Sequence, residues 1–228
     1  MSAIIRRAIN FVRREVLRDS FLLEVKRWVS DNGDATLRLE YPLCKNSVVW
    51  DIGGYHGDFA AQIHQKYGCL VDVFEPVPIF HKMCLSRFSG NENIRCLKFG
   101  LSEKAGWFEI SDDEDASSFV RGSAGVNGHR AELRPVTSMF DELGVSRVDL
   151  LKINIEGGEF DVLPALIDSG LVERVRFLQI QFHNFIPGAK QKRDAIRGGL
   201  NKTHTEMWNY PFVWESWVIR NENWEACD

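Results

Sequence analysis

Acidic side chains follow two apolar stretches of this sequence, in positions where they could bind a ligand. Asp51 ends one apolar run and is followed by Gly53, Gly54 and Gly57, and Glu75 ends the next run. In open α/β sheets, ligands bind beyond the carboxyl ends of the strands, and an acid about 20 residues after a glycine loop binds ribose hydroxyls. The spacing therefore predicts a nucleoside-binding site built from these five residues.

The spacing of the glycines separates two kinds of nucleotide. A dinucleotide fingerprint, G-x-G-x-x-G, places a pyrophosphate at a helix N-terminus. Tyr55 and Asp58 stand where its second and third glycines would be, which leaves D-x-G-x-x-x-G. A carboxylate such as Asp51 repels a phosphate and attracts a cation. S-adenosylmethionine is a cation without a phosphate, so we expect it as the cofactor, and a nicotinamide dinucleotide is the alternative.

Four further residues are expected to contact this cofactor. Pro76 keeps Glu75 out of helical angles and so ends the strand there. Leu101 and Ser102 follow the third predicted strand, on the adenine side of the site. Asn154 ends the fourth predicted strand, at the same edge of the sheet.

Two residues are the leading candidates for the catalytic base, and His204 is a distant third. Transfer of a methyl group from such a cofactor would need in-line alignment with the acceptor, and a hydroxyl acceptor would gain from a group that takes its proton. His183 ends an apolar strand, and an unperturbed histidine titrates near neutrality, so it is the first candidate, and Glu156 is the second. Glu159, three residues from Glu156, and the more distant His204 are expected to contact substrate. The structural alternatives are acids that stabilise a helix start and a histidine bonded within a strand end.

A metal is not indicated by this cluster. Its carboxylate and amide oxygens suit magnesium, an ion that prefers oxygen ligands. No ligand spacing in the sequence requires one, so we predict no metal site.

The elements that must position these residues alternate between strand and helix. Apolar strands separated by helices predict a mostly parallel sheet with helices on both faces. The aromatic-rich C-terminal segment predicts an antiparallel edge strand. Strands are expected at 47–53, 69–76, 93–102, 106–113, 147–157, 175–185 and 212–221, and helices at 58–68, 78–88, 136–144, 159–170 and 190–200.

Composition narrows the class of protein. The 228 residues fit one large domain better than two, and a net charge of -4 gives no attraction to nucleic acid. The five cysteines form no C-x-x-C pair, which favours reduced thiols in a cytoplasm. We find no signal peptide and no apolar run near the roughly 20 residues of a membrane span.

The first 30 residues form a separate predicted unit, an amphipathic helical segment ahead of a domain at 31–228. Apolar residues recur at helical spacing, with arginines between them. The favoured interpretation is a helix packed on the domain or on a second subunit of a homo-oligomer. The alternative is contact with the inner membrane surface, which would suit a lipid-linked substrate.

The stretches that carry these residues resemble the FkbM-type methyltransferases over roughly residues 47–185. The matching segments are VVWDIGGYHGDFA, VDVFEPVPIFHKM, IRCLKFGLSEKAGWFEI, VDLLKINIEGGEFDVL and LQIQFHNF. The resemblance implies a Rossmann-like class I methyltransferase fold with a seven-stranded sheet, and O-methylation of glycan sugars or secondary metabolites. It assigns Asp51, Gly53 and Gly57 to the cofactor loop and Glu75 to the ribose. Leu101 and Ser102 match its adenine side.

The same resemblance has departures. Asn154, Glu156 and Glu159 fall on a lysine–acid–glutamate motif, with Asn154 where an aspartate is usual and Gly158 where an alanine is usual. An asparagine carbonyl can orient a ligand, but it cannot serve as a strong base. The leading hypothesis is an O-methyltransferase of a small molecule or glycan, foremost a sugar in surface polysaccharide biosynthesis. A secondary-metabolite O-methyltransferase and an inactive cofactor-binding relative are the alternatives.

Overall fold

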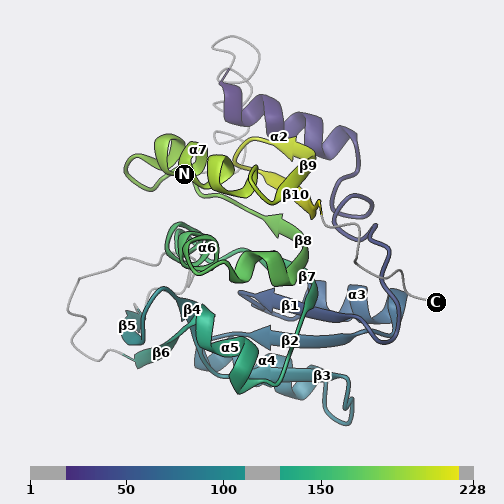
Figure 1. Ribbon diagram of the computed structural model, residues 1–228. Helices are drawn as coiled ribbons and strands as arrows, with labels where there is room; N and C mark the ends of the chain where they lie inside the picture. The colour runs from purple at the N-terminus through teal and green to yellow at the C-terminus, as the bar shows by residue number, and fades with distance from the viewer. Residues whose placement is uncertain (1–18, 111–128, 221–228) are drawn as a thin grey trace, which may run out of the picture.

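A seven-stranded sheet forms the centre of the protein (Figure 1). The computed structural model describes residues 19–110 and 129–220. The strand order is β3-β2-β1-β7-β8-β10-β9, and the first five of these are parallel. The strands are β1 (Val48–Ile52), β2 (Leu70–Phe74), β3 (Ile94–Leu97), β7 (Val148–Ile153), β8 (Val175–Ile180), β9 (His204–Tyr210) and β10 (Trp214–Ile219).

Helices cover both faces of this sheet, as its alternating apolar side chains require. Val49 of β1 packs in the cluster that includes Phe59 of the first covering helix, and Trp50 packs in the opposite cluster with Phe160. Helices α3 and α4 thus lie on one face and α5, α6 and α7 on the other. Their bounds are α3 (Asp58–Tyr67), α4 (Pro78–Arg87), α5 (Met139–Glu142), α6 (Glu159–Asp168) and α7 (Ala189–Leu200), with short 3-10 turns at Val136–Ser138 and Leu171–Arg174.

The antiparallel C-terminal strand is confirmed, but its place at the edge is wrong. β10 pairs antiparallel with both β8 and β9, so it lies inside the sheet and β9 forms the edge. The sequence predicts no strand at β9, because polar and apolar residues do not alternate regularly there. The strand conformation of β9 depends on its pairing with β10.

The segment expected as one strand at 93–102 divides into two. β3 joins the large sheet, whereas β4 (Gly100–Ser102) joins a separate three-stranded sheet with β6 (His129–Pro135) and β5 (Gly106–Ile110). Fold class and helix positions otherwise match the prediction.

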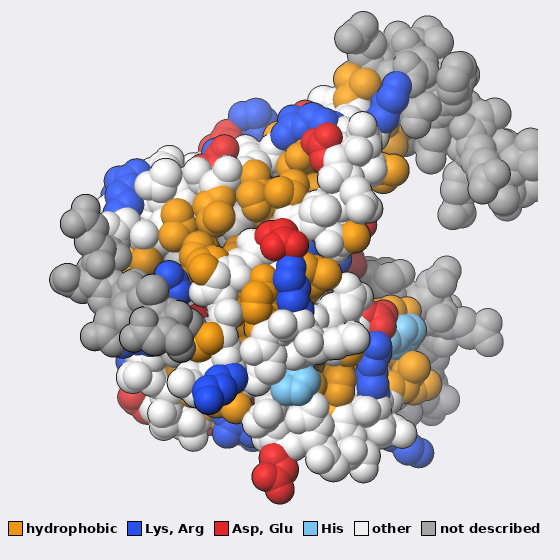
Figure 2. All heavy atoms as spheres, turned by 90° about the vertical axis from the view of Figure 1, so that its right-hand side faces the viewer, with side chains coloured by type: hydrophobic (Ala, Val, Ile, Leu, Met, Phe, Trp, Pro, Cys, Tyr) orange, Lys and Arg blue, Asp and Glu red, His pale blue; other side chains and the backbone are white. Residues whose placement is uncertain are grey.

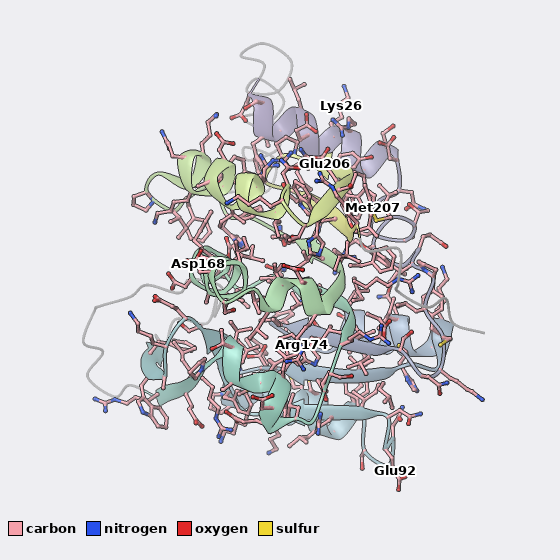
Figure 3. All side chains as sticks on the ribbon, viewed as in Figure 1. Lys26, Glu92, Asp168, Arg174, Glu206 and Met207 are labelled. Carbon is pink, nitrogen blue, oxygen red and sulfur yellow. The ribbon has the colours of Figure 1, made fainter. Side chains whose placement is uncertain are left out.

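An N-terminal helix, α2 (Ser20–Ser30), packs on the edge of the sheet. Trp28 is buried against the rings of Trp208 and Tyr210, with ring centroids 5.7 and 5.0 Å away. Glu206 and Met207 of β9 lie beside α2 in Figure 3. The predicted boundary at residue 30 falls at the end of α2. The ring contacts of Trp28 place this helix against the sheet of the domain. The remainder of the predicted N-terminal helix, residues 1–18, lies outside the described residues.

The prediction that all cysteines are reduced is wrong for Cys44. Cys69, Cys84 and Cys96 are free, but Cys44 is disulfide-bonded, so not every cysteine is reduced. In the part of the chain that the structure describes, no helix has both the length and the apolar character of a membrane span.

Candidate functional site

The glycine loop connects β1 to α3 and is held tightly between its neighbours. Gly53 has φ +84°, and a Cβ there would lie 2.0 Å from the carbonyl oxygen of Asn154. A Cβ on Gly54 would lie 2.2 Å from the side chain of Val73. Gly57 has φ +76° and packs against the Phe88 ring. The glycines are therefore required because the loop lies directly against β2, β7 and α4.

Glu75 lies under this loop, as its spacing predicted. Its two carboxylate oxygens accept hydrogen bonds from the backbone N–H groups of Tyr55 at 2.7 Å and Val77 at 2.8 Å. Each oxygen keeps a lone pair, so the carboxylate can still accept from two ligand hydroxyls. Burial raises the pKa of Glu75 to about 7, although the two N–H groups act in the opposite direction.

Asp51 is fully buried and does not present a free charge to the loop. Its Oδ1 lies 2.7 Å from the Lys152 ammonium, which also donates to the carbonyl of Gly53 at 2.7 Å. Burial lowers the pKa of Lys152, with Asp51 opposing that shift. Lys152 therefore compensates the negative charge of Asp51. Repulsion by Asp51 alone does not exclude a phosphate from this loop.

The residues predicted on the adenine side come together with Glu75. Pro76 follows it, and a Cβ on Gly100 would lie 3.3 Å from the Pro76 ring. Leu101 and Ser102 continue from Gly100 in β4 and are buried. The start of β4 therefore lies against the turn that follows β2.

A tight turn between β7 and α6 brings the acidic motif to the same edge of the sheet. The N–H of Asn154 donates to the carbonyl of Ile52, which aligns this turn with the glycine loop. Glu156 adopts φ +50°, a left-handed conformation that is uncommon for a residue with a side chain. Strained backbone of this kind concentrates at functional sites. The turn leaves the Glu156 side chain partly exposed.

Glu159 and His183 form an ion pair at the same edge of the sheet. The buried Glu159 accepts from the backbone N–H of His183 at 2.8 Å, and its Oε1 lies 3.0 Å from His183 Nδ1. Glu156 Oε1 lies 3.6 Å from His183 Nε2. Burial lowers the pKa of His183, but the bonds to Glu156 and Glu159 outweigh it and raise the pKa to about 9. At neutral pH this histidine is an imidazolium between two carboxylates.

His204, predicted to contact substrate, lies elsewhere. It is completely buried, and its Nε2 lies 3.0 Å from the carbonyl of Val175. Val175 begins β8, whereas the site lies beyond the end of that six-residue strand, about 20 Å away at 3.3 Å per residue. Edge-strand packing, not substrate, explains this histidine. In the described residues, no group of three or more His, Cys, Asp or Glu side chains could hold a metal ion.

Three residues of the site were not predicted. Lys152 could have been found from its charge inside an apolar strand and from its place as the lysine of the motif that includes Asn154 and Glu156. Tyr55 adopts a left-handed conformation in the glycine loop, with φ +49°. The sequence does not indicate this, because residues other than glycine rarely adopt it. Phe185 is 57% exposed, with its ring centroid 5.4 Å from that of His183, and only the tertiary structure brings it there.

Comparisons with known proteins identify the family and the fold of this chain. A family model described as "Methyltransferase FkbM domain" matches residues 51–212. The crystal structure of Methyltransferase FkbM from Methylobacillus flagellatus KT superposes with a TM-score of 0.52 and 14% identity, over 94% of this chain and 59% of that chain. The AMB antimetabolite synthetase AmbE of Pseudomonas aeruginosa strain PAO1 is 37% identical over 79 residues, which are 35% of this chain and 4% of that protein. This chain therefore spans a small part of that synthetase and somewhat over half of the solved structure.

The family match includes every part of the site, from Asp51 in the glycine loop to His183 beyond β8. It covers well over half of the chain, and the strand order is that of a Rossmann-like methyltransferase fold. The chain belongs to the FkbM methyltransferase domain family.

Proposed function

We propose that this protein is an S-adenosylmethionine-dependent O-methyltransferase that acts on a hydroxyl of a small molecule or glycan. The observation that carries the proposal is the meeting of two groups at one edge of the sheet. Glu75 with the glycine loop offers a nucleoside site, and Glu156 with His183 offers a proton acceptor beside it. The cofactor, when bound, would supply an electrophilic methyl group and a neutral leaving group.

The described residues fit such a cofactor. The Glu75 carboxylate has free lone pairs for the 2′ and 3′ hydroxyls of a ribose. Asp51 Oδ2 is buried without a hydrogen-bond partner, which leaves one acceptor behind the loop. Among the described basic side chains at the loop, Lys152 is paired with Asp51, and Arg87 with Asp58. A pyrophosphate would thus meet compensated cations here, which disfavours the nicotinamide alternative.

The pairing of His183 assigns the proton-accepting role to Glu156. An imidazolium has no free lone pair, so His183 cannot take a proton while it is charged. Glu156 is partly exposed at the mouth of the site and 3.6 Å from His183 Nε2. In this proposal Glu156 takes the hydroxyl proton, and His183, fixed by Glu159, positions Glu156. Asn154 contributes hydrogen bonds near the cofactor and no proton transfer.

Phe185 supports an acceptor with a ring. Its exposed ring lies beside His183, and an aromatic face can bind the apolar face of a sugar or another ring. The C-terminal aromatic residues Trp208, Tyr210 and Trp214 offer no such face, because they pack against α2 and the sheet. The likeness to AmbE, an antimetabolite synthetase, favours a second candidate, a secondary-metabolite hydroxyl. A glycan of the cell surface remains the first, with a lipid-linked form at the inner membrane surface.

Surface charge gives little support to a nucleic-acid substrate. In the described residues of the face in Figure 2, basic side chains are interspersed with acidic and hydrophobic ones, and no continuous basic area is visible there. Nucleic-acid binding relies on such areas.

Calorimetric titration with S-adenosylmethionine, and with NAD as the control ligand, tests the cofactor assignment. We expect micromolar binding of S-adenosylmethionine only, weakened at least about tenfold in Glu75→Ala, since each hydrogen bond to a charged group contributes about 1.5–3 kcal/mol. Glu92→Ala is the matched control, because Glu92 is an exposed acid that precedes β3, at the amino ends of the strands. Binding of NAD alone would overturn the proposal. Methyl transfer to nucleotide sugars, methyl glycosides and hydroxylated metabolites would then separate the two acceptor classes.

A further inference from the structure

A row of polar side chains crosses one face of the sheet just before its carboxyl edge. Asp51, Lys152, Gln179 and Ser216 are neighbours in register on β1, β7, β8 and β10. All four side chains are buried. The row two residues earlier on the same face is entirely apolar, with Val49, Leu150, Phe177 and Val218. The polar row therefore separates the core from the site and needs an explanation.

Lys152 is the member of this row that reaches the cofactor loop. An ammonium has three donors, and two of them are used at 2.7 Å, on Asp51 Oδ1 and on the carbonyl of Gly53. That carbonyl belongs to the same planar peptide unit as the N–H of Gly54. The N–H of Gly54 in turn donates to the carbonyl of Phe74 at 3.3 Å. The peptide between the two glycines is thus held from β7 on one side and from β2 on the other.

The next peptide of the loop, between Gly54 and Tyr55, contacts the carboxylate that is proposed to bind the ligand. The N–H of Tyr55 donates to Glu75 Oε2 at 2.7 Å, so the position of this N–H sets the orientation of the carboxylate. Glycine would otherwise allow several conformations here, because it lacks a Cβ. Lys152 removes that freedom before any ligand arrives, and preorganised groups bind with a smaller entropic cost.

We propose that Lys152 is a positioning residue for the cofactor. Its ammonium fixes the peptide between Gly53 and Gly54, and through Tyr55 it fixes the Glu75 carboxylate. Lys152 does not touch the ligand itself, since its ammonium lies behind the loop. This inference rests on the proposed function, because the ligand is S-adenosylmethionine or its product.

Titration with S-adenosylhomocysteine of the wild-type chain, Lys152→Met and Gln179→Met tests the proposal. Methionine retains most of the lysine stem and removes both hydrogen bonds. Gln179 is equally buried in the adjacent register position, but its bonds go to Arg38 and Tyr41, not to the loop. We expect affinity to fall at least about tenfold in Lys152→Met and to stay within about twofold in Gln179→Met, both measured at a temperature where each variant is folded.

Amide hydrogen exchange in the unliganded protein gives a second measurement. We expect faster exchange of the segment 52–57 in Lys152→Met only, because a purely structural ion pair would not hold this segment selectively. Lys152→Met leaves the Asp51 carboxylate buried without its partner, which is destabilising. If that variant does not fold, Asp51→Asn with Lys152→Met removes both charges and is compared with Asp51→Asn alone, because Asp51 itself belongs to the predicted cofactor site.

The outcomes separate the two proposals. Wild-type affinity and unchanged exchange in a folded Lys152 variant would overturn the positioning role and leave the methyltransferase assignment intact. Equal losses of affinity in Lys152→Met and Gln179→Met would overturn it too, since stability alone would then explain both. A wild-type chain that binds neither S-adenosylmethionine nor S-adenosylhomocysteine would overturn the proposed function together with this inference.

Discussion

The Glu159 carboxylate holds His183 twice, by accepting from its backbone N–H at 2.8 Å and by approaching its ring Nδ1 to 3.0 Å. Glu159 begins α6 and also accepts from the N–H of Gly157, so it joins the start of a helix to the end of β8. A buried carboxylate with three such partners gives the imidazole ring one orientation. Together with the approach of Glu156, this contact raises the pKa of His183 to about 9 and keeps the ring charged at neutral pH.

Stability is expected to fall with increasing pH because of His183. Its pKa rises from 6.5 to about 9 on folding, so its contribution is complete below pH 6.5 and is lost as the pH rises through 9. The difference corresponds to about 3 kcal/mol. Urea denaturation at pH 6, 7.5 and 9.5 should show this loss in the wild type and not in His183→Gln, which can still donate to Glu159. Parallel curves for the two proteins would contradict the raised pKa.

The pH profile of methyl transfer distinguishes Glu156 from His183 as the proton acceptor. If charged His183 positions Glu156, kcat should fall as the pH rises through about 9, because the imidazolium is lost. If His183 itself takes the proton, kcat should rise over the same interval. Glu156→Gln should lower kcat about 10²- to 10⁴-fold with little change in cofactor affinity. An unchanged kcat in that variant would remove Glu156 from the mechanism.

Binding of the nucleoside is expected to strengthen with pH because of Glu75. Its pKa is raised to about 7 in the free protein, and the ionised carboxylate accepts ribose hydroxyls better than the protonated one. Methylthioadenosine is the suitable probe, since it lacks the titrating amino-acid portion of the cofactor. Its affinity should rise between pH 6 and 8 and be independent of pH in Glu75→Gln. A flat wild-type profile would show that Glu75 does not bind the ribose.

Replacement of Phe185 should affect the acceptor and not the cofactor. Phe185→Ala removes the exposed ring beside His183, so KM for a ring-containing acceptor should rise roughly 5- to 10-fold, as expected from about 1 kcal/mol of aromatic contact. Phe185→Tyr should retain most of the affinity. Met207→Ala is the control, since Met207 is also exposed but lies on β9 beside α2. Equal effects of the Phe185→Ala and Met207→Ala substitutions on KM would exclude the platform.

Truncation of Trp28 should destabilise the protein without altering the site. Trp28 packs between α2 and β9, and a Cβ on Gly33 would overlap its ring, so the pocket is closely filled. Trp28→Ala should cost about 3–5 kcal/mol of unfolding free energy. Denaturant midpoints measure this cost, and Val29→Ala, at an exposed position of the same helix, is the control. A cost below about 1 kcal/mol would show that α2 is not docked on the sheet in solution.

The fold class, and the position of the glycine loop and the acids at one edge of the sheet, can be predicted from the order of residues along the chain. Apolar runs of strand length separated by helical periods require a parallel sheet with two covered faces, whatever the details of packing. Glycines and acids placed at strand ends then have to meet at the carboxyl edge. The loop at Gly53, the acid at Glu75 and the cluster at Glu156 can therefore be predicted, because each depends on a local pattern and on one topological rule.

The tertiary structure alone decided the rest. Strand order and antiparallel pairing placed β10 inside the sheet and moved His204 to the end away from the site. Lys152 and Asp51 are 101 residues apart in the sequence, and only folding brings them into contact. Their ion pair compensates the negative charge that Asp51 was expected to present at the loop. The protonation of His183 likewise depends on Glu159 and Glu156, which approach it only after folding. Electrostatic properties are sums over neighbours in space, so they could not be predicted from the residue types in order along the chain.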